Sequence, residues 1–476
     1  MSSIKKNFVY NSFLTVSNYL ISLLLYPYCA RVLGVERMGT VGFVQNIVAY
    51  FLLLASFGLT TLGVREIAKS RETGQLSSVF NNLFSLNLLF TFLSVVVYTI
   101  LIFIVPRFHV EIEVFTIGIA EIFFTTVCVD WLFKGLEDFR FITIRNIIIK
   151  IIYIVFVFVF IKSPDDYVLF YALTVTTTIV TSIVNISYAR KEIEIRLFNG
   201  IHLWKYFKEA CTIGLYALMA SMYTTFNVAF LGFMKDDTQV GLYTTSLKLY
   251  TIILGFMTAF STVMLPRMSS LATGSNTNEY KRLLSISFEL LLAISLPIIV
   301  FLMFYANECI YLLAGDEFLP ASNMSRIVIP LIFFVGIAQI LTFQILIPKN
   351  LEKISFMSAV IGAFVGVILN ILLVPKYAGI GTCISLAITE FTVTAFLCAV
   401  CLRRGLFQFP NNLFLKRVIS CIGYIVICIL LSKFLGYGLI SMICSAFLCS
   451  IYFLFEQTFI LKNEYVVSII NKFIRI

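Results

Sequence analysis

The run TVGFVQNIVAYFLLLASFGLTTLG, at residues 40–63, contains no charged side chain. Arg31 and Arg37 precede it, and Arg65 and Arg71 follow it. About 20 helical residues are enough to cross a hydrocarbon core of about 30 Å. An apolar run of this length between charged ends predicts a transmembrane helix.

The rest of the chain repeats this pattern. Of 476 residues, 60% are hydrophobic and 13% are charged, and the mean hydropathy is +0.98. A soluble domain is about half apolar and about a quarter charged, so the composition excludes that class. We predict an all-α polytopic membrane protein with about 14 transmembrane helices, at 8–30, 40–63, 80–105, 114–133, 143–161, 167–188, 211–233, 241–264, 283–305, 325–347, 356–374, 380–402, 418–435 and 439–461.

The Lys and Arg residues predict the orientation. With the N-terminus in the cytoplasm, 25 of the 35 Lys and Arg residues fall on the cytoplasmic side, Arg145 and Arg417 among them, and eight fall outside. Such a bias is typical of cytoplasmic loops. We therefore expect both termini in the cytoplasm. The net charge of +10 reports topology, and we expect no nucleic-acid partner.

Signals for processing, disulfides and metals are weak. The first apolar run is too long for a signal peptide and lacks a small-residue cleavage site. The eleven cysteines lie almost entirely within spans, which predicts no disulfide framework. Cys398 and Cys401 form a CxxC inside an apolar span, where a structural role is favoured, and His109 and His202 lie in loops on opposite sides. We predict no catalytic residue, no metal and no cofactor.

An internal repeat predicts the domain organisation. The phrase KGLEDFRF at 134–141 recurs as KNLEKISF at 349–356, and a shift of 202 residues pairs Gly39 with Gly241. We expect both phrases at cytoplasmic turns. Two halves of six spans each would have the same orientation and enclose a central cavity between two pseudo-symmetric bundles. The predicted domains are 1–188, an N-terminal six-helix bundle; 189–210, a cytoplasmic amphipathic linker; 211–404, a C-terminal six-helix bundle; and 405–476, two extra transmembrane helices and a cytoplasmic tail.

Polar side chains recur on one face of several spans. Thr244, Lys248 and Thr251 lie at i, i+4 and i+7, on one helix face. Ser and Thr also join membrane helices by hydrogen bonds, so a single stripe fits either reading. Several long stripes together favour a hydrated cavity. Its predicted polar lining is Asn11, Asn18, Asn46, Thr178, Asn185, Thr244 and Thr251.

Lys248 and Lys150 fall within spans and are candidates for binding an anion. A charge at membrane depth costs roughly 2.5–3.5 kcal/mol on insertion scales. Each lysine must therefore face water, a carboxylate or an anionic ligand, and for Lys248 a structural ion pair remains an open alternative. Lys150 could instead extend to the headgroups. Arg31 follows Pro27 by four residues, and because a proline kink leaves its direction open, a cavity-facing Arg31 is a hypothesis.

Three acidic residues within spans, Glu390, Glu121 and Glu289, are candidates for coupling transport to H⁺ or Na⁺, or for serving as counter-ions to the buried cations.

The segment 30–72 resembles the polysaccharide-transporter flippases of the multidrug/oligosaccharidyl-lipid/polysaccharide exporter superfamily. The family pattern there is R-x-L-G-P-E-x-x-G, a second helix, F-G-L and R-E-I-A. Val35 replaces the usual proline. The K-x-L-E phrases and the six-plus-six repeat extend the resemblance over most of the chain. The matching residues are Arg31, Leu33, Gly34, Glu36, Gly39, Phe57, Gly58, Leu59, Arg65, Glu66, Ile67 and Ala68.

This resemblance implies a MATE-like fold and a flippase, not an enzyme. Such proteins move polyprenyl-diphosphate-linked oligosaccharide repeat units from the cytoplasmic to the outer leaflet of the bacterial cytoplasmic (inner) membrane, by alternating access, for O-antigen, capsule or exopolysaccharide. The implied partners are this lipid-linked oligosaccharide, membrane lipids, an H⁺ or Na⁺ coupling ion and a polysaccharide polymerase. An anionic diphosphate suits Lys248, Lys150 and Arg31 as counter-charges.

Other classes of protein predict different residues. An ion-coupled multidrug exporter of the MATE type, the main alternative, would line its cavity with acids, and the two buried lysines argue against it. A membrane enzyme would need reactive side chains on a sizeable outer loop. The outer pairs Asp165–Asp166 and Asp236–Asp237 lie in loops of only a few residues. A scaffolding role leaves the buried lysines unexplained.

Overall fold

The computed structural model describes residues 2–198, 203–272 and 277–460, and every regular element in this part is a helix. The all-helical membrane fold is therefore as predicted. Eleven described helices are long and apolar enough to cross a membrane. The count is below 14 because α1 (Ser2–Ser56) and α15 (Glu352–Arg403) each carry two predicted spans. In addition, among the fully described residues of α9 (Leu203–Met234), the apolar stretch is the shorter Thr225–Met234.

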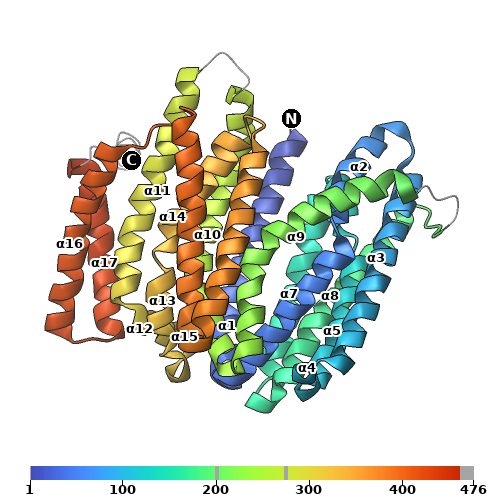
Figure 1. Ribbon diagram of the computed structural model, residues 1–476, viewed down its shortest axis with the longest axis horizontal. Helices are drawn as coiled ribbons and strands as arrows, with labels where there is room; N and C mark the ends of the chain where they lie inside the picture. Colours follow the sequence, from blue (N-terminus) through green and yellow to red (C-terminus); the bar gives the residue numbers. More distant parts are fainter. Residues whose placement is uncertain (1, 199–202, 273–276, 461–476) are drawn as a thin grey trace. The chain divides into compact units, whose positions relative to one another are not determined.

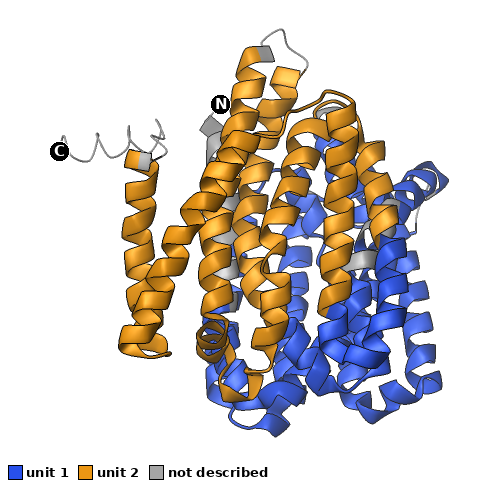
Figure 2. Ribbon diagram, turned by 60° about the vertical axis from the view of Figure 1, so that its left-hand side comes forward, with its two compact units in different colours: residues 1–244, 363–382 blue, residues 245–362, 383–476 orange. Residues whose placement is uncertain are grey.

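The helices of the chain are labelled in Figure 1, and its two compact units are coloured in Figure 2. The first unit contains residues 1–244 and 363–382, and the second contains residues 245–362 and 383–476. These units do not coincide with the two predicted six-helix bundles. The predicted domain boundaries and the central cavity stay predictions.

In the first unit, α1 packs against α3, α5, α7 and α9, and α5 packs against α8. Buried aromatic side chains such as Phe80 and Trp131, which stack with their ring centroids 5.4 Å apart, fill its core. The helices that follow α1 in this unit are α2 (Leu59–Thr73), α3 (Leu76–Ile104), α4 (Pro106–Val110), α5 (Ile112–Val127), α6 (Asp130–Gly135), α7 (Phe139–Phe160), η1 (Pro164–Asp166), α8 (Tyr167–Glu192) and α9.

In the second unit, α11 packs against α14 and α16, and α16 packs against α17. The first turns of α10 and the middle of α15 belong to the first unit. The helices are α10 (Asp237–Ala272), α11 (Thr277–Phe304), α12 (Ala306–Ala314), η2 (Asp316–Phe318), α13 (Ala321–Val328), α14 (Leu331–Ile340), the π-helical η3 (Leu341–Leu346), α15, α16 (Asn411–Leu435), α17 (Leu439–Phe455) and the π-helical η4 (Glu456–Ile460).

The two double-length helices change direction at identifiable residues. Gly34 adopts φ 76° and ψ 171° inside α1, a conformation that glycine reaches without steric cost. Ala378 adopts φ 48° inside α15, three residues after Pro375, whose ring cannot continue the hydrogen-bond ladder. Each of these residues separates two helices, so two spans follow one another there without a longer loop.

The two repeated charged phrases lie at turns between helices, as predicted. The first links α6 to α7 through Glu137, at φ 60°, and the second precedes α15 through Asn350, at φ 55°. Asp138 begins α7 by accepting a hydrogen bond from the Phe141 amide at 3.2 Å, which satisfies one of the free N–H groups of the first turn.

Candidate functional site

Two glycines that the repeat pairs, Gly39 and Gly241, lie where α1 meets the start of α10 in the first unit. A Cβ on Gly39 would lie 1.8 Å from the Asp237 carbonyl oxygen, and a Cβ on Gly241 would lie 2.1 Å from the Val35 carbonyl oxygen. Only glycine allows the two backbones to come this close. At these two positions the backbones of α1 and α10 are therefore in direct contact.

The buried side chain of Asp237 stabilises this junction through two polar contacts. Thr40 donates to Asp237 Oδ2 at 2.8 Å, and Arg107 of α4 forms an ion pair with Oδ1. Three helices therefore converge on one carboxylate. Removing Asp237 would leave a half-buried arginine without its counter-charge.

Just after the C-terminal end of α1, a second pair of glycines, Gly58 and Gly214, makes a similar contact with α9. Gly58 has φ 79°, and a Cβ there would lie 2.6 Å from both the Ala210 carbonyl oxygen and the Gly214 nitrogen. Arg65 of α2 forms an exposed ion pair with Glu209 of α9. In the first unit, the segment from Gly39 of α1 to Arg65 of α2 is thus held against α9 and the start of α10 near each of its ends.

Between these ends, two buried amides meet. Asn370 donates from Nδ2 to Asn227 Oδ1 at 2.7 Å and to the Gly366 carbonyl at 2.7 Å. Within the described residues, Asn370 Oδ1 and Asn46 Oδ1 are buried and accept no hydrogen bond. Buried acceptors of this kind are available to a ligand or to water.

The three predicted anion-binding residues lie on different helices. Lys150, on α7, and Lys248, on α10, are both half-buried, while Arg31 is exposed. Arg31 donates from Nη1 to the Pro27 carbonyl at 2.9 Å, so it bonds back to its own helix. Lys150 and Arg31 belong to the first unit and Lys248 to the second. A shared cation site stays a prediction.

Several predicted lining residues bond to their own helices. Thr244 donates to the Gly241 carbonyl at 3.2 Å, and Thr251, which is exposed, donates to the Lys248 carbonyl at 3.1 Å. Thr178 is half-buried. The side chains of Asn11 and Asn18 lie outside the described part. A cavity lined by these residues stays a prediction.

Asn185 belongs to a buried cluster around Arg145, which sequence analysis counted only as a cytoplasmic charge. Arg145 is 5% exposed and donates to Asp130 Oδ1 at 3.0 Å and to Asn146 Oδ1 at 2.9 Å. Asn185 accepts from Arg145 and donates to Asp130 at 2.9 Å. The signal in the sequence was an acid and an arginine at the ends of neighbouring spans.

The three candidate acids have different surroundings. Glu121 accepts a hydrogen bond from the hydroxyl of Tyr171, and Glu289 lies 3.8 Å from Arg417 Nη2. Glu390 is 5% exposed, and no contact in the described part of the chain joins it to a cation. Glu390 is therefore the candidate whose charge the structure leaves least compensated.

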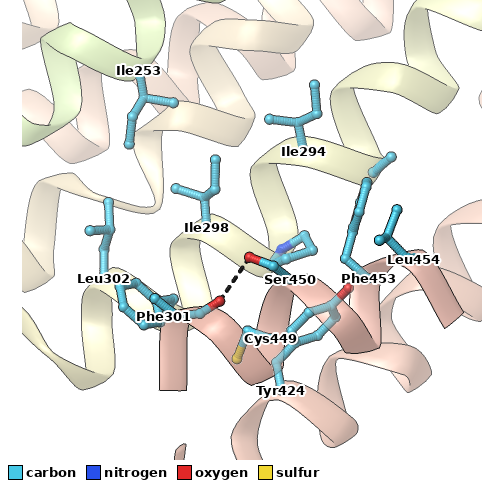
Figure 3. Close-up of a pocket in the computed structure, with 13 residues that line it drawn as sticks. Ile253, Ile294, Ile298, Phe301, Leu302, Tyr424, Cys449, Ser450, Phe453 and Leu454 are labelled. Carbon is cyan, nitrogen blue, oxygen red and sulfur yellow. Dashed lines mark hydrogen bonds between the residues drawn. The ribbon is translucent and has the colours of Figure 1, made fainter. Parts of the chain in front are cut away.

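An apolar pocket of about 560 Å³ lies in the second unit. Figure 3 shows Ile294, Ile298 and Phe301 from α11 around it, with side chains from α10, α16 and α17. The hydroxyl of Ser450 donates to the Ala446 carbonyl at 2.8 Å and is thus used within its own helix. None of the described residues that line the pocket is charged, and this lining suits a hydrocarbon chain.

A buried ionic network adjoins this apolar pocket through Tyr424. The hydroxyl of Tyr424 donates to Glu456 Oε2 at 2.6 Å, and Arg417 donates to Glu456 Oε1 at 3.1 Å and to Gln457 Oε1 at 3.0 Å. Arg417 is 2% exposed and Glu456 is 1% exposed. Sequence analysis placed Arg417 at the cytoplasmic end of a span, so its burial and its partners were missed.

The sequence matches a known protein family. Residues 4–272 match the model of the polysaccharide biosynthesis protein family, and the chain belongs to that family. A putative O-antigen transporter from Escherichia coli K12 is 22% identical over 410 residues, which cover 83% of this chain and 96% of the relative. A probable low-salt glycan biosynthesis flippase from Haloferax volcanii, Agl15, is 22% identical over 77% of each chain.

Solved structures establish the fold class. The lipid II flippase MurJ, in an inward closed conformation, matches with a TM-score of 0.79 at 14% identity, over 95% of this chain and 99% of that chain. An inward-facing multidrug resistance MATE family transporter matches with a TM-score of 0.57 at 13% identity, over 83% of this chain and 98% of that chain. The protein is a multi-pass membrane protein with the MurJ and MATE transporter fold.

Proposed function

We propose that this protein is a flippase for polyprenyl-diphosphate-linked oligosaccharide repeat units. It moves them from the cytoplasmic to the outer leaflet of a bacterial cytoplasmic membrane, where a polysaccharide polymerase uses them for O-antigen, capsule or exopolysaccharide. The family match over residues 4–272 carries this proposal. It acts as a transporter and not as an enzyme, with both termini in the cytoplasm.

The apolar pocket of the second unit supports a lipid-linked substrate. A polyprenyl tail in the bilayer is already out of water, so an apolar pocket stabilises it through close packing. Ile298 and Phe301 provide such a surface. We propose that part of the lipid tail lies here during transport, with the rest in the bilayer.

The diphosphate requires positive charge. Lys248, Lys150 and Arg31 are the side chains we propose for this task, because a cation at membrane depth is stabilised by an anionic ligand. The amide and hydroxyl side chains of the predicted lining would bind the sugars. Glu390 is our candidate for H⁺ or Na⁺ coupling.

Alternating access needs a closed junction that can open. The contact between α1 and the start of α10 supports such a gate, because Gly39 and Gly241 seal it and Asp237 holds it through two polar partners. We propose that this gate faces outward and opens when those two interactions break. A junction made of a few polar contacts is easier to open than an apolar core.

The test compares strains that contain the wild type, a deletion, Lys248→Ala or the control Lys433→Ala, which changes an exposed lysine of α16. Lipid-linked oligosaccharide in the inner leaflet and surface polysaccharide are measured at equal protein level. We expect the deletion and Lys248→Ala to accumulate inward-facing lipid-linked oligosaccharide and lose surface polymer. We expect Lys433→Ala to match the wild type.

Two results would contradict this account. A deletion that leaves both pools unchanged and sensitises cells to cationic drugs would replace the flippase by a multidrug exporter. A deletion with the expected phenotype, together with a fully active Lys248→Ala, would keep the function and remove Lys248 from the site.

A further inference from the structure

A second pocket, of about 640 Å³, lies between α7 and α8 in the first unit. We call it the α7–α8 pocket. Its lining follows one face of each helix, with Phe141, Ile148 and Ile152 spaced along α7, and Val180 and Val184 along α8. Its volume is within the range of ligand sites.

The side of this pocket is open. Ile144 is 45% exposed, Ile148 is 53% exposed and Ile152 is 48% exposed, although all three line the pocket. Exposed isoleucines in a row on a membrane-spanning helix face hydrocarbon, because water would penalise them. A ligand can therefore enter from the bilayer.

One end of the pocket is polar and contains two arginines. Arg145 already donates a hydrogen bond to Asp130. Asp138 accepts hydrogen bonds from the Phe141 amide and from the Tyr188 hydroxyl, each at 3.2 Å. Arg140 is exposed, and it makes no hydrogen bond or ion pair within the residues that the structure describes. Its guanidinium offers five N–H donors to a ligand.

The length of the α7–α8 pocket matches the thickness of one leaflet of the hydrocarbon core. From Phe141 to Ile152 the pocket follows α7 for about 16 Å, at 1.5 Å per residue. A hydrocarbon core is about 30 Å thick, so this length is about half of it. A single acyl chain fits, with its phosphate at the Arg140 end. A polyprenyl-linked sugar would leave most of its tail and all of its saccharide outside.

We propose that the α7–α8 pocket binds an anionic glycerophospholipid, distinct from the transported lipid. Its phosphate accepts from Arg140, close to the N-terminus of α7, where the helix dipole also favours an anion. One acyl chain covers Ile148, Ile152 and Val184. This site goes beyond the proposed function and does not depend on it.

The test uses native mass spectrometry on the full chain in detergent, without any lipid-linked oligosaccharide. The probes are phosphatidylglycerol and phosphatidylethanolamine with identical acyl chains. The variants are Arg140→Ala, Ile148→Trp, which fills the pocket, and the control Arg190→Ala. Arg190 is exposed near the end of α8 and does not line the pocket. A photo-crosslinker at Ile148 identifies the lipid bound in membranes.

We expect the wild type to bind phosphatidylglycerol about fivefold tighter than phosphatidylethanolamine. The attraction between one arginine and an anionic headgroup corresponds to about that ratio of affinities. Arg140→Ala should abolish the preference for phosphatidylglycerol, and Ile148→Trp should weaken the binding of both lipids. Arg190→Ala should change neither the preference nor the binding of either lipid. Equal binding of both lipids, or equal losses in Arg140→Ala and Arg190→Ala, would overturn the proposal. A crosslink to lipid-linked oligosaccharide alone would assign the pocket to the transport pathway and also overturn it.

Discussion

The two pockets described above are similar in size, about 560 and 640 Å³, but differ in what their arginines do. Beside the apolar pocket, Arg417 is bonded to Glu456 and Gln457. Beside the α7–α8 pocket, Arg145 is likewise paired, but Arg140 has no partner in the described part of the chain. A paired, buried arginine fixes helices, whereas an exposed arginine at the edge of a pocket remains available for a ligand. Pairing, and not the number of arginines, therefore determines which arginine can bind an anion.

The largest expected effect is on Arg417. Arg417→Ala should lower the free energy of unfolding by about 3–5 kcal/mol, because it leaves Glu456 buried and without its cation. Denaturant titration of the purified protein in detergent measures this loss. The lipid preference of the α7–α8 pocket should not change.

Glu289→Gln provides the matched control for this network. Glu289 lies 3.8 Å from Arg417 and its side chain is 28% exposed, against 1% for Glu456. Glu289→Gln should therefore lower the free energy of unfolding by no more than about 1 kcal/mol. Equal destabilisation by Arg417→Ala and Glu289→Gln would show that Glu456 is not the main partner.

A smaller effect is expected at Arg145. Arg145→Ala should lower the free energy of unfolding by about 2–3 kcal/mol, less than Arg417→Ala. The loss is smaller because the side chain of its partner Asp130 is 35% exposed and keeps part of its hydration. The same titration measures it. If Arg145→Ala destabilises the protein more than Arg417→Ala, burial of the acid does not set the cost.

Sequence reasoning was most effective for the helices. Uncharged runs of about 20 residues have one stable structure in a bilayer, so the fourteen predicted spans fall on helices within the described residues. The predicted gaps between spans, at 30–40 and 374–380, also contain Gly34 and Ala378, whose non-helical backbone divides α1 and α15 into two helices each. The residue at which each break falls depends on local backbone geometry, which hydropathy does not predict.

The sites were harder to predict, because pairing depends on which helices pack together. Lys150 and Lys248 were noticed because a lysine in mid-span is unusual. Arg145 and Arg417 were not, because arginine is common at the ends of spans. Glu456 follows Arg417 by 39 residues, and no periodicity within one helix relates the two.

We propose that the chain translocates a lipid-linked saccharide with part of its tail in the apolar pocket. The most direct test reconstitutes the protein in vesicles and follows polyprenyl-diphosphate-linked oligosaccharide between leaflets. Ile298→Trp fills the pocket, and Ile440→Trp changes an exposed residue of α17 as a control. We predict translocation by the wild type and Ile440→Trp, and a rate about tenfold lower for Ile298→Trp. No translocation by the wild type, or equal rates for all three proteins, would contradict the account.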